Sequence, residues 1–215
     1  MGNPRDIERR SVFDGVEVRK SDNGGATLRG YAARFNSVYS MGWFTEEVHR
    51  DAFQNADMTD VRVLFNHNPD NILGRTKSGT ARVGVDNQGL WYEVDLPESA
   101  AVVREAIQRG DITQSSWGFM LRYTDQTNGD KWEKRDGKDH RILMDVKEVF
   151  DASPVTFPAN PDTSIAKRSF DAAHEETIHP PEEAEAVEET PADDGLELEL
   201  EIALLEHGQL ITNTQ

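Results

Sequence analysis

Short runs of alternating apolar and polar residues, separated by turn signals, favour a mainly β fold for this chain. Such runs lie at 26–35, 61–67, 80–86, 89–96, 115–126, 131–146 and 146–155. Alternation with a period of two is typical of strands that bury one face. Asn87, Gln88 and Gly89 separate two of the runs and predict a hairpin, and Asn128-Gly129 predicts a second turn before 131–146.

Two segments show helical spacing instead. Residues 46–56 place Val48 and Phe53 on one helical face, and residues 97–111 begin with a proline and end beside a glycine. Both patterns are typical of amphipathic helices. Many short strands with two interspersed helices predict a mainly β, α+β fold, in which a closed or partly closed β-barrel is flanked by helices.

Acidic charge is concentrated toward the C-terminus. Residues 170–215 hold 14 of the 40 acidic residues and no Lys or Arg, which leaves 26 acidic and 23 basic residues in 1–169. This division predicts a folded domain over 11–168 and an acidic, largely disordered tail over 169–215. The last stretch, GLELELEIALLEHG, favours either a short docking helix or a solubilising segment without fixed structure.

Composition excludes several classes of protein. The chain has no cysteine, so disulfides and thiolate chemistry are excluded. It has neither an apolar run of about 20 residues nor a signal-peptide pattern at its start, and we expect a soluble cytoplasmic protein. Lys and Arg do not cluster as a nucleic-acid surface requires. His67 and Asp70 are close in sequence, but two ligands do not make a zinc site, and we expect no metal.

His67 and a pair of serines are candidates for acid–base and nucleophilic chemistry. His67 ends the run 61–67 and shares the parity of its apolar positions, with the polar segment NPDN beyond it, which suits a general base. Ser115 and Ser116 precede a glycine that leaves room for a substrate backbone, and a serine nucleophile needs a base within hydrogen-bond reach. The alternatives are a strand-end histidine that bonds a loop carbonyl and two ordinary strand-start serines, and spacing alone favours these.

Asp151 is the candidate carboxylate. It shares strand parity with Val149 and Ser153, and a carboxylate among apolar strand residues is costly unless it has a partner such as an imidazole N–H. Glu148, on the opposite face, is the second choice. Either acid could instead pair at the rim with Lys147 or Arg141.

Five segments, in order, carry a resemblance to a known family. They are LRGYAARFNSV, FTEEVHRDAF, VRVLFNHNPDNILGRT, GLWYEVDLPESAAVVREAIQRGDITQSSWGFML and EVFDASPVTFPANPDT. Together they resemble the tailed-phage prohead (capsid maturation) proteases, which are similar to herpesvirus assemblin-type serine proteases. The resemblance covers about residues 10–168.

The resemblance implies a catalytic set of His67, Ser116 and Asp151. The family's serine, followed by x-Gly-Phe, corresponds to Ser116 and not Ser115. Its acidic position often stands in Glu-Val-Ser, whereas Asp151 stands in Asp-Ala-Ser, one methylene shorter. Herpesvirus relatives use a second histidine as the third member, but His140 lies in the wrong segment for that role.

The resemblance also implies a serine endopeptidase of the phage procapsid, within the host cytoplasm. It would cut the major capsid protein, a scaffold protein and itself, and residues 166–170 would be an accessible place for self-cleavage. No cofactor, nucleic acid or membrane is implied, and the herpesvirus likeness leaves a homodimer open. Two alternatives use no catalysis: a capsid assembly or scaffold protein with the barrel as a binding module, and a small-ligand-binding barrel.

Overall fold

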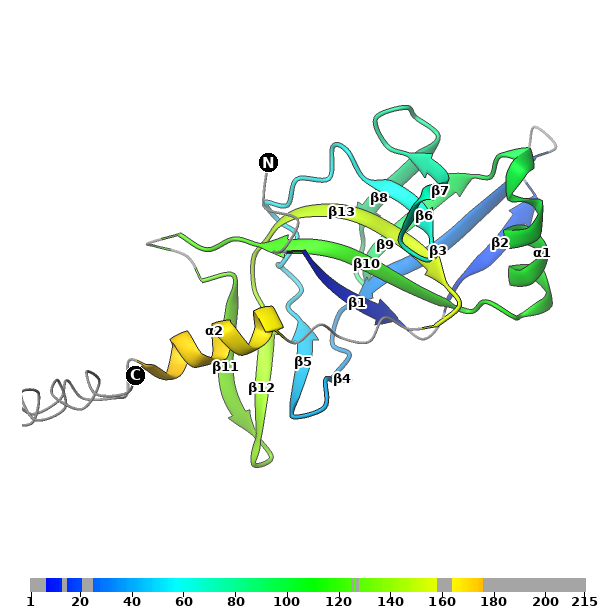
Figure 1. Ribbon diagram of the computed structural model, residues 1–215. Helices are drawn as coiled ribbons and strands as arrows, with labels where there is room; N and C mark the ends of the chain where they lie inside the picture. Colours follow the sequence, from blue (N-terminus) through cyan, green and yellow to red (C-terminus); the bar gives the residue numbers. More distant parts are fainter. Residues whose placement is uncertain are drawn as a thin grey trace, which may run out of the picture. The chain divides into compact units, whose positions relative to one another are not determined.

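The computed structural model describes residues 7–12, 15–20, 25–124, 126, 128–157 and 164–175 (Figure 1). The strands in these ranges are β1 (Glu8–Val12), β2 (Glu17–Lys20), β3 (Ala26–Arg34), β4 (Tyr39–Ser40), β5 (Phe44–Val48), β6 (Arg62–Phe65), β7 (Asn68–Arg75), β8 (Ala81–Val85), β9 (Gly89–Asp95), β10 (Gln114–Leu121), β11 (Asp130–Arg135), β12 (Lys138–Leu143) and β13 (Val146–Val155). The helices are a 3-10 turn (Glu98–Ala100), α1 (Ala101–Arg109) and α2 (Ser164–Glu175).

The described strands form three sheets. The first has the order β1-β10-β13-β6-β7, the second β11-β12-β5-β4, and the third β2-β3-β9-β8. The predicted class, mainly β with two helices, is confirmed. The predicted closed barrel is absent from the described part of the chain, because β3 packs against β1 and β10 without the backbone pairing that closure requires.

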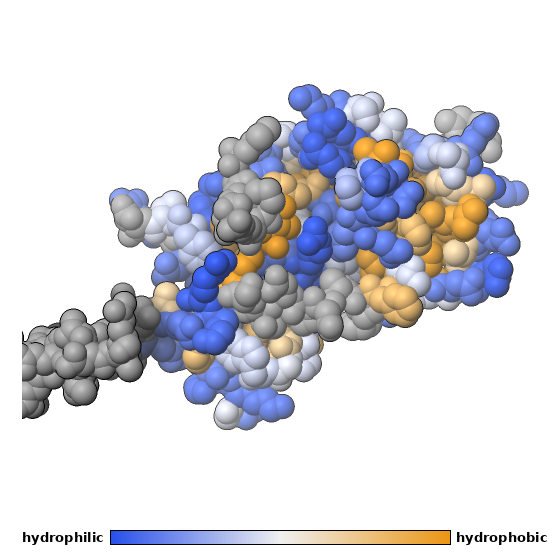
Figure 2. Space-filling model, viewed as in Figure 1, coloured by the Kyte–Doolittle hydropathy of each residue, from blue (hydrophilic) through white to orange (hydrophobic). Residues whose placement is uncertain are grey.

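One hydrophobic core is shared by the first and third sheets. It includes Leu28 of β3, Val63 of β6, Tyr92 of β9, and Trp117 and Phe119 of β10, all fully buried or nearly so. The rings of Trp117 and Phe119 stack with their centroids 3.9 Å apart. Hydrophobic colour also reaches the surface over α1 in Figure 2. The core therefore holds β10 rigidly from one face and leaves its other face for the site.

The predicted hairpin over 80–96 is confirmed as β8 and β9. Val85 pairs with Leu90, and the Asp86 carboxylate accepts hydrogen bonds from the backbone N–H groups of Gln88 (2.8 Å) and Gly89 (3.1 Å). The helix predicted over 97–111 is confirmed as the 3-10 turn and α1. It ends at Gly110, whose φ of 82° is the left-handed cap that glycine adopts without strain.

The helix predicted over 46–56 is wrong. Phe44–Val48 is strand β5, and turns follow it. The strand forms because it pairs in parallel with β12, and every second side chain from Phe44 onward is buried, including the carboxylate of Glu46. A helical face made by Val48 and Phe53 would have left Glu46 without the buried arginine partners it has in the sheet.

The segment 131–146, predicted as one strand, is a hairpin. Asp136 and Gly137, both with positive φ, turn the chain between β11 and β12. Asp-Gly is a strong signal for a two-residue turn. The single strand was predicted because the residues on both sides of Asp136-Gly137 continue one alternating pattern. The predicted domain boundary at residue 168 falls inside α2, and the predicted tail beyond residue 175 lies outside the described residues.

Candidate active site

Ser116 lies on strand β10, which is paired on both sides, with β1 and β13. Ser116 lies opposite Ser153 of β13, so the two side chains project from the same face. Ser115 projects from the other face, where its Oγ lies 2.8 Å from the hydroxyl oxygen of Tyr92 inside the core. Burial raises the pKa of the Tyr92 hydroxyl, which therefore stays protonated. Alternation along β10 separates a buried structural serine from one that faces the site.

His67 lies in the two-residue turn between β6 and β7, not at a strand end. Phe65 pairs with Asn68, and both intervening residues, Asn66 and His67, have a φ of 56°. This is the left-handed conformation that tight hairpin turns require. The parity argument for His67 is therefore wrong, and the segment expected as a loop, 68–71, begins β7. The turn, rather than the strand, aims the imidazole.

The structure brings the three predicted side chains together. The Nε2 atom of His67 lies 2.6 Å from Oγ of Ser116, and its Nδ1 atom lies 2.5 Å from Oδ1 of Asp151. The His67 and Asp151 side chains are only 12% and 8% exposed, and Ser116 is fully buried. A buried carboxylate that holds Nδ1–H leaves Nε2 free to accept a proton from a hydroxyl. The arrangement can thus deprotonate Ser116.

A β-bulge in β13 gives Asp151 its direction. Phe119 pairs with Val149 and Gly118 pairs with Asp151, which leaves Phe150 as an extra residue in β13. Val149 therefore points into the core, while Asp151 projects from the opposite face of the sheet. Shared parity predicts one face for both residues, and that prediction is wrong because a bulge breaks the alternation.

The other candidates named from the sequence do not contact the imidazole of His67. Glu148 lies opposite Met120, further along β13, and its backbone pairs with that of Asp57. His140 is fully buried in β12, where its Nδ1 lies 2.8 Å from Oγ1 of Thr45. Asp151 is therefore the acid that the fold places beside His67.

Two further residues position the acid, and the sequence gives an expected role to only one of them, the glycine at 118, as room for a substrate backbone. The hydroxyl of Ser153 donates a 2.7 Å hydrogen bond to Oδ1 of Asp151, the same oxygen that faces His67. Gly118 lies opposite Asp151, and a Cβ atom at position 118 would lie 2.5 Å from Oδ2. Their positions in the sequence are a usable signal, because Gly118 lies two residues after Ser116 and Ser153 lies two residues after Asp151.

A buried ion network lies on the core side of β1. It consists of Glu8, Arg10, Glu46, Asp130 and Arg141, none more than 7% exposed. Arg141 Nη1 lies 2.6 Å from Glu8, and Arg10 Nε lies 2.5 Å from Glu46. Burial alone would raise the pKa of Glu8, but the attraction of Arg141 and Arg10 outweighs it and holds that pKa below its ordinary value. The network ties the N-terminal strand to the second sheet.

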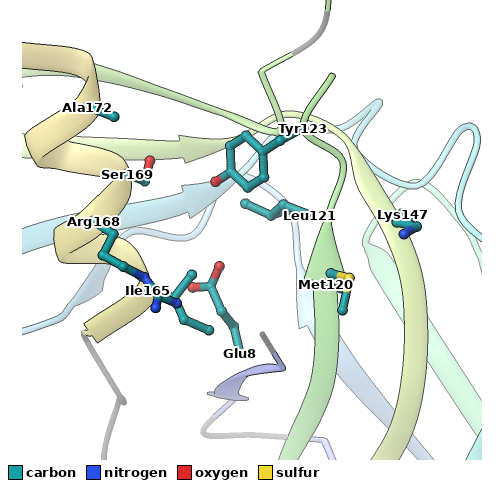
Figure 3. A pocket seen from close by; sticks show the side chains of 9 residues that line it. All are labelled: Glu8, Met120, Leu121, Tyr123, Lys147, Ile165, Arg168, Ser169 and Ala172. Atoms are coloured by element: carbon teal, nitrogen blue, oxygen red, sulfur yellow. The ribbon is translucent and has the colours of Figure 1, made fainter. Parts of the chain in front are cut away.

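A cavity of about 490 Å³ lies between α2, β1 and β10 (Figure 3). Glu8, Tyr123 and Ser169 reach toward it from three parts of the chain. The Ser169 hydroxyl also donates a 2.5 Å hydrogen bond to Asp130, which connects α2 to the ion network. None of the three predicted site residues lines this cavity, so it is separate from the candidate active site.

The described residues show neither a metal site nor a membrane-spanning helix. They contain no group of three or more His, Cys, Asp or Glu side chains arranged to hold a metal ion. No helix among them combines the length and the apolar character needed to cross a bilayer. The His67, Ser116 and Asp151 cluster is thus the arrangement with an evident chemistry.

A hydroxyl, an imidazole and a carboxylate in hydrogen-bonded series define the residue set of the Ser-His-Asp hydrolases. The family model of the caudovirus prohead serine proteases matches residues 14–177, and the chain belongs to this family. The predicted family is therefore confirmed, and the chain is a phage capsid maturation protease by family. No curated protein and no solved structure matches the chain. The likeness to herpesvirus assemblin stays a prediction.

Proposed function

We propose that this protein is a serine endopeptidase in which Ser116 is the nucleophile, His67 the general base and Asp151 the acid that orients it. One observation carries the proposal: a single imidazole bridges a hydroxyl at 2.6 Å and a carboxylate at 2.5 Å. Groups that are 49 and 84 positions apart in the chain have no local reason to meet. If these positions served only to fill the interior, apolar side chains would do so at a lower cost in free energy.

The reaction proceeds through an acyl-enzyme. Ser116 Oγ attacks the scissile carbonyl carbon as its proton passes to Nε2 of His67, and Asp151 stabilises the imidazolium that forms. His67 then gives the proton to the leaving amine, and the peptide C–N bond breaks. A water molecule, deprotonated by the same imidazole, attacks the acyl carbon; the C–Oγ bond breaks, and His67 returns the proton to Oγ of Ser116. The Ser153 hydroxyl keeps Oδ1 of Asp151 in place throughout.

The substrates that the family supports are the major capsid protein or a scaffold protein, cut inside the procapsid. Because Ser116 has no exposed surface in this conformation, a substrate carbonyl reaches it only after the surrounding chain moves. Homodimerisation, proposed from the herpesvirus likeness, is one event that would move the chain around Ser116.

Self-cleavage is a further part of the proposal, but the segment 166–170 is not the accessible junction the sequence predicts. It lies within α2, and Ala166 is fully buried. Proteases cut extended chain, so cleavage there requires α2 to unwind first. Intact-mass measurement of the purified protein, with Ser116→Ala as the uncut reference, tests self-cleavage. One unchanged mass in an active preparation contradicts it.

Co-expression with the capsid protein tests the catalytic assignment. The wild type should shorten the capsid subunit, and Ser116→Ala should leave it intact. Ser115→Ala is the matched control: it removes a neighbouring hydroxyl that bonds Tyr92 and should keep activity. Reaction with a fluorophosphonate, which labels activated serines, should follow the same order. If the wild type and Ser116→Ala both leave the capsid subunit uncut, the domain is an assembly module and not a protease, and if Ser116→Ala still cuts it, Ser116 is not the nucleophile.

A further inference from the structure

The candidate general base is held in an unfavourable backbone conformation. His67 occupies the second position of a two-residue turn, where glycine is the preferred residue, and its φ is 56°. Left-handed backbone is costly for a residue with a Cβ atom, and such strain persists only where the surroundings over-determine it. Some group outside the turn must therefore hold it.

The neighbouring Asn66 makes the contacts that fix this turn. Its Oδ1 accepts a 2.8 Å hydrogen bond from the backbone N–H of Thr156, and its Nδ2 donates a 3.1 Å hydrogen bond to Oγ1 of Thr156. Its own backbone N–H donates to the carbonyl of Pro154 at 3.1 Å. Three hydrogen bonds thus join one turn residue to the end of β13.

The same strand, β13, also carries Asp151 and Ser153. The paired residues of β6 and β13 are Asp151 with Arg62 and Ala152 with Val63, and beyond them the one backbone hydrogen bond from Asn66 to Pro154 reaches the turn. The Asn66 contacts extend the connection past the last paired residue. They fix the position of the imidazole relative to the carboxylate, because both are then attached to one strand.

We infer that Asn66 and Thr156 form a positioning latch for His67. This inference rests on the proposed function, since it assigns the two residues to the orientation of the general base. Neither residue touches the reacting atoms. The latch keeps the imidazole within hydrogen-bonding distance of both Ser116 and Asp151, against a backbone conformation that would otherwise relax. Both latch side chains are exposed, so changing them removes no part of the core.

Asn66→Gly is the variant that isolates the latch. Glycine accepts a positive φ more readily than asparagine, so the turn itself is preserved, and only the side-chain hydrogen bonds to Thr156 are lost. We expect fluorophosphonate labelling of Ser116 to slow by about 10- to 100-fold, because a misplaced catalytic group costs rate without loss of fold. Thr156→Val should slow labelling by a smaller factor, and Thr156→Ser should restore it.

A matched control comes from the second tight turn. Asp136 also has a positive φ, at 51°, in the hairpin between β11 and β12, so Asp136→Gly makes the same backbone change away from the site. It should label at the wild-type rate. A proton NMR spectrum supplies a readout that a merely structural role would not move. The hydrogen-bonded Nδ1–H of His67 should give a low-field signal in the wild type and lose it in Asn66→Gly.

The outcomes separate the latch from the proposed function. Wild-type labelling and an intact low-field signal in Asn66→Gly would overturn the latch and leave the catalytic assignment standing. A wild type that is not labelled at Ser116 would contradict the proposed function. The NMR comparison would then still decide whether Asn66 holds the imidazole beside Asp151.

Discussion

Gly118→Ala should impair the site by displacing the carboxylate of Asp151. An added Cβ atom would lie 2.5 Å from Oδ2 and 3.4 Å from Cγ of Asp151, and 3.5 Å from Cγ2 of Ile7. Non-bonded atoms prefer separations of about 3.5 Å or more, so the carboxylate must move by about 1 Å. The methyl group has no alternative direction, because the backbone of β10 is paired on both sides.

The size of the effect follows from what Asp151 would lose. Its Oδ1 faces both Nδ1 of His67 at 2.5 Å and the hydroxyl of Ser153 at 2.7 Å, and the residue is 6% exposed. A misplacement of about 1 Å can cost on the order of 100-fold in rate. Complete loss of the corresponding acid costs about 10⁴-fold in serine proteases, which sets an upper bound. Overpacking should lower the free energy of unfolding by about 1–3 kcal/mol.

The assay is the rate of fluorophosphonate labelling at Ser116, read beside thermal unfolding. Gly110→Ala is the control for stability: it places a Cβ at a φ of 82°, costs roughly 1–2 kcal/mol, and has no atom within 4 Å to disturb. Labelling should fall about 100-fold in Gly118→Ala and stay unchanged in Gly110→Ala. A Gly118→Ala protein that labels at the wild-type rate would refute the geometric reasoning, whatever its stability.

Three further predictions concern charge, backbone and side-chain length. Because the pKa of Glu8 is lowered in the folded protein, its contribution is present above its unfolded pKa of 4.5 and is lost as the pH falls through the folded value. Glu8→Gln should cost about 3–5 kcal/mol at neutral pH, by leaving buried Arg141 and Arg10 short of a partner, and should flatten this acid dependence in denaturant titrations. The free energy of unfolding of His67→Gly should exceed that of His67→Ala by about 1 kcal/mol, because only glycine adopts the positive φ without strain. Equal free energies of unfolding would contradict the strain. Asp151→Glu should label on the order of 100-fold more slowly, because the longer acid must overpack; a wild-type rate would mean that the site relaxes around it.

The sequence predicts the strands that carry the site better than the way the side chains are aimed. The run containing Ser116 and the hairpin over 80–96 follow from alternation and turn residues, and both are confirmed. The directions of His67 and Asp151 do not follow, because one depends on a turn and the other on a bulge. Alternation alone predicts neither a turn nor a bulge, so the proposed catalytic set rests on the family resemblance and not on strand parity.

The buried ion network marks a second limit. Local sequence gives no sign that Glu46 and Arg141 are buried, and Glu46 lies in the segment for which a helix was expected. Burial of opposite charges depends on partners distant in the chain: Arg10 and Glu46 are 36 positions apart, and Arg141 and Glu8 are 133 apart. Local patterns carry no information on such pairs. These ion pairs help to hold the sheets together, and they join residues too far apart in the chain for a local sequence pattern to predict.

The shorter acid of this chain fits the remaining geometry of the site. Asp151 reaches Nδ1 of His67 at 2.5 Å without the added methylene of a glutamate. It does so because a tight turn, rather than a longer loop, brings the imidazole toward β13, and because Gly118 leaves the carboxylate room on the sheet. The position of Asp151 therefore depends jointly on its short side chain, on the strained turn that holds His67 and on Gly118. Lengthening the acid or loosening the turn alone would separate Nδ1 of His67 from its partner. The side chain of Asn66, which fixes the turn to the strand of the acid, is what makes the short reach sufficient.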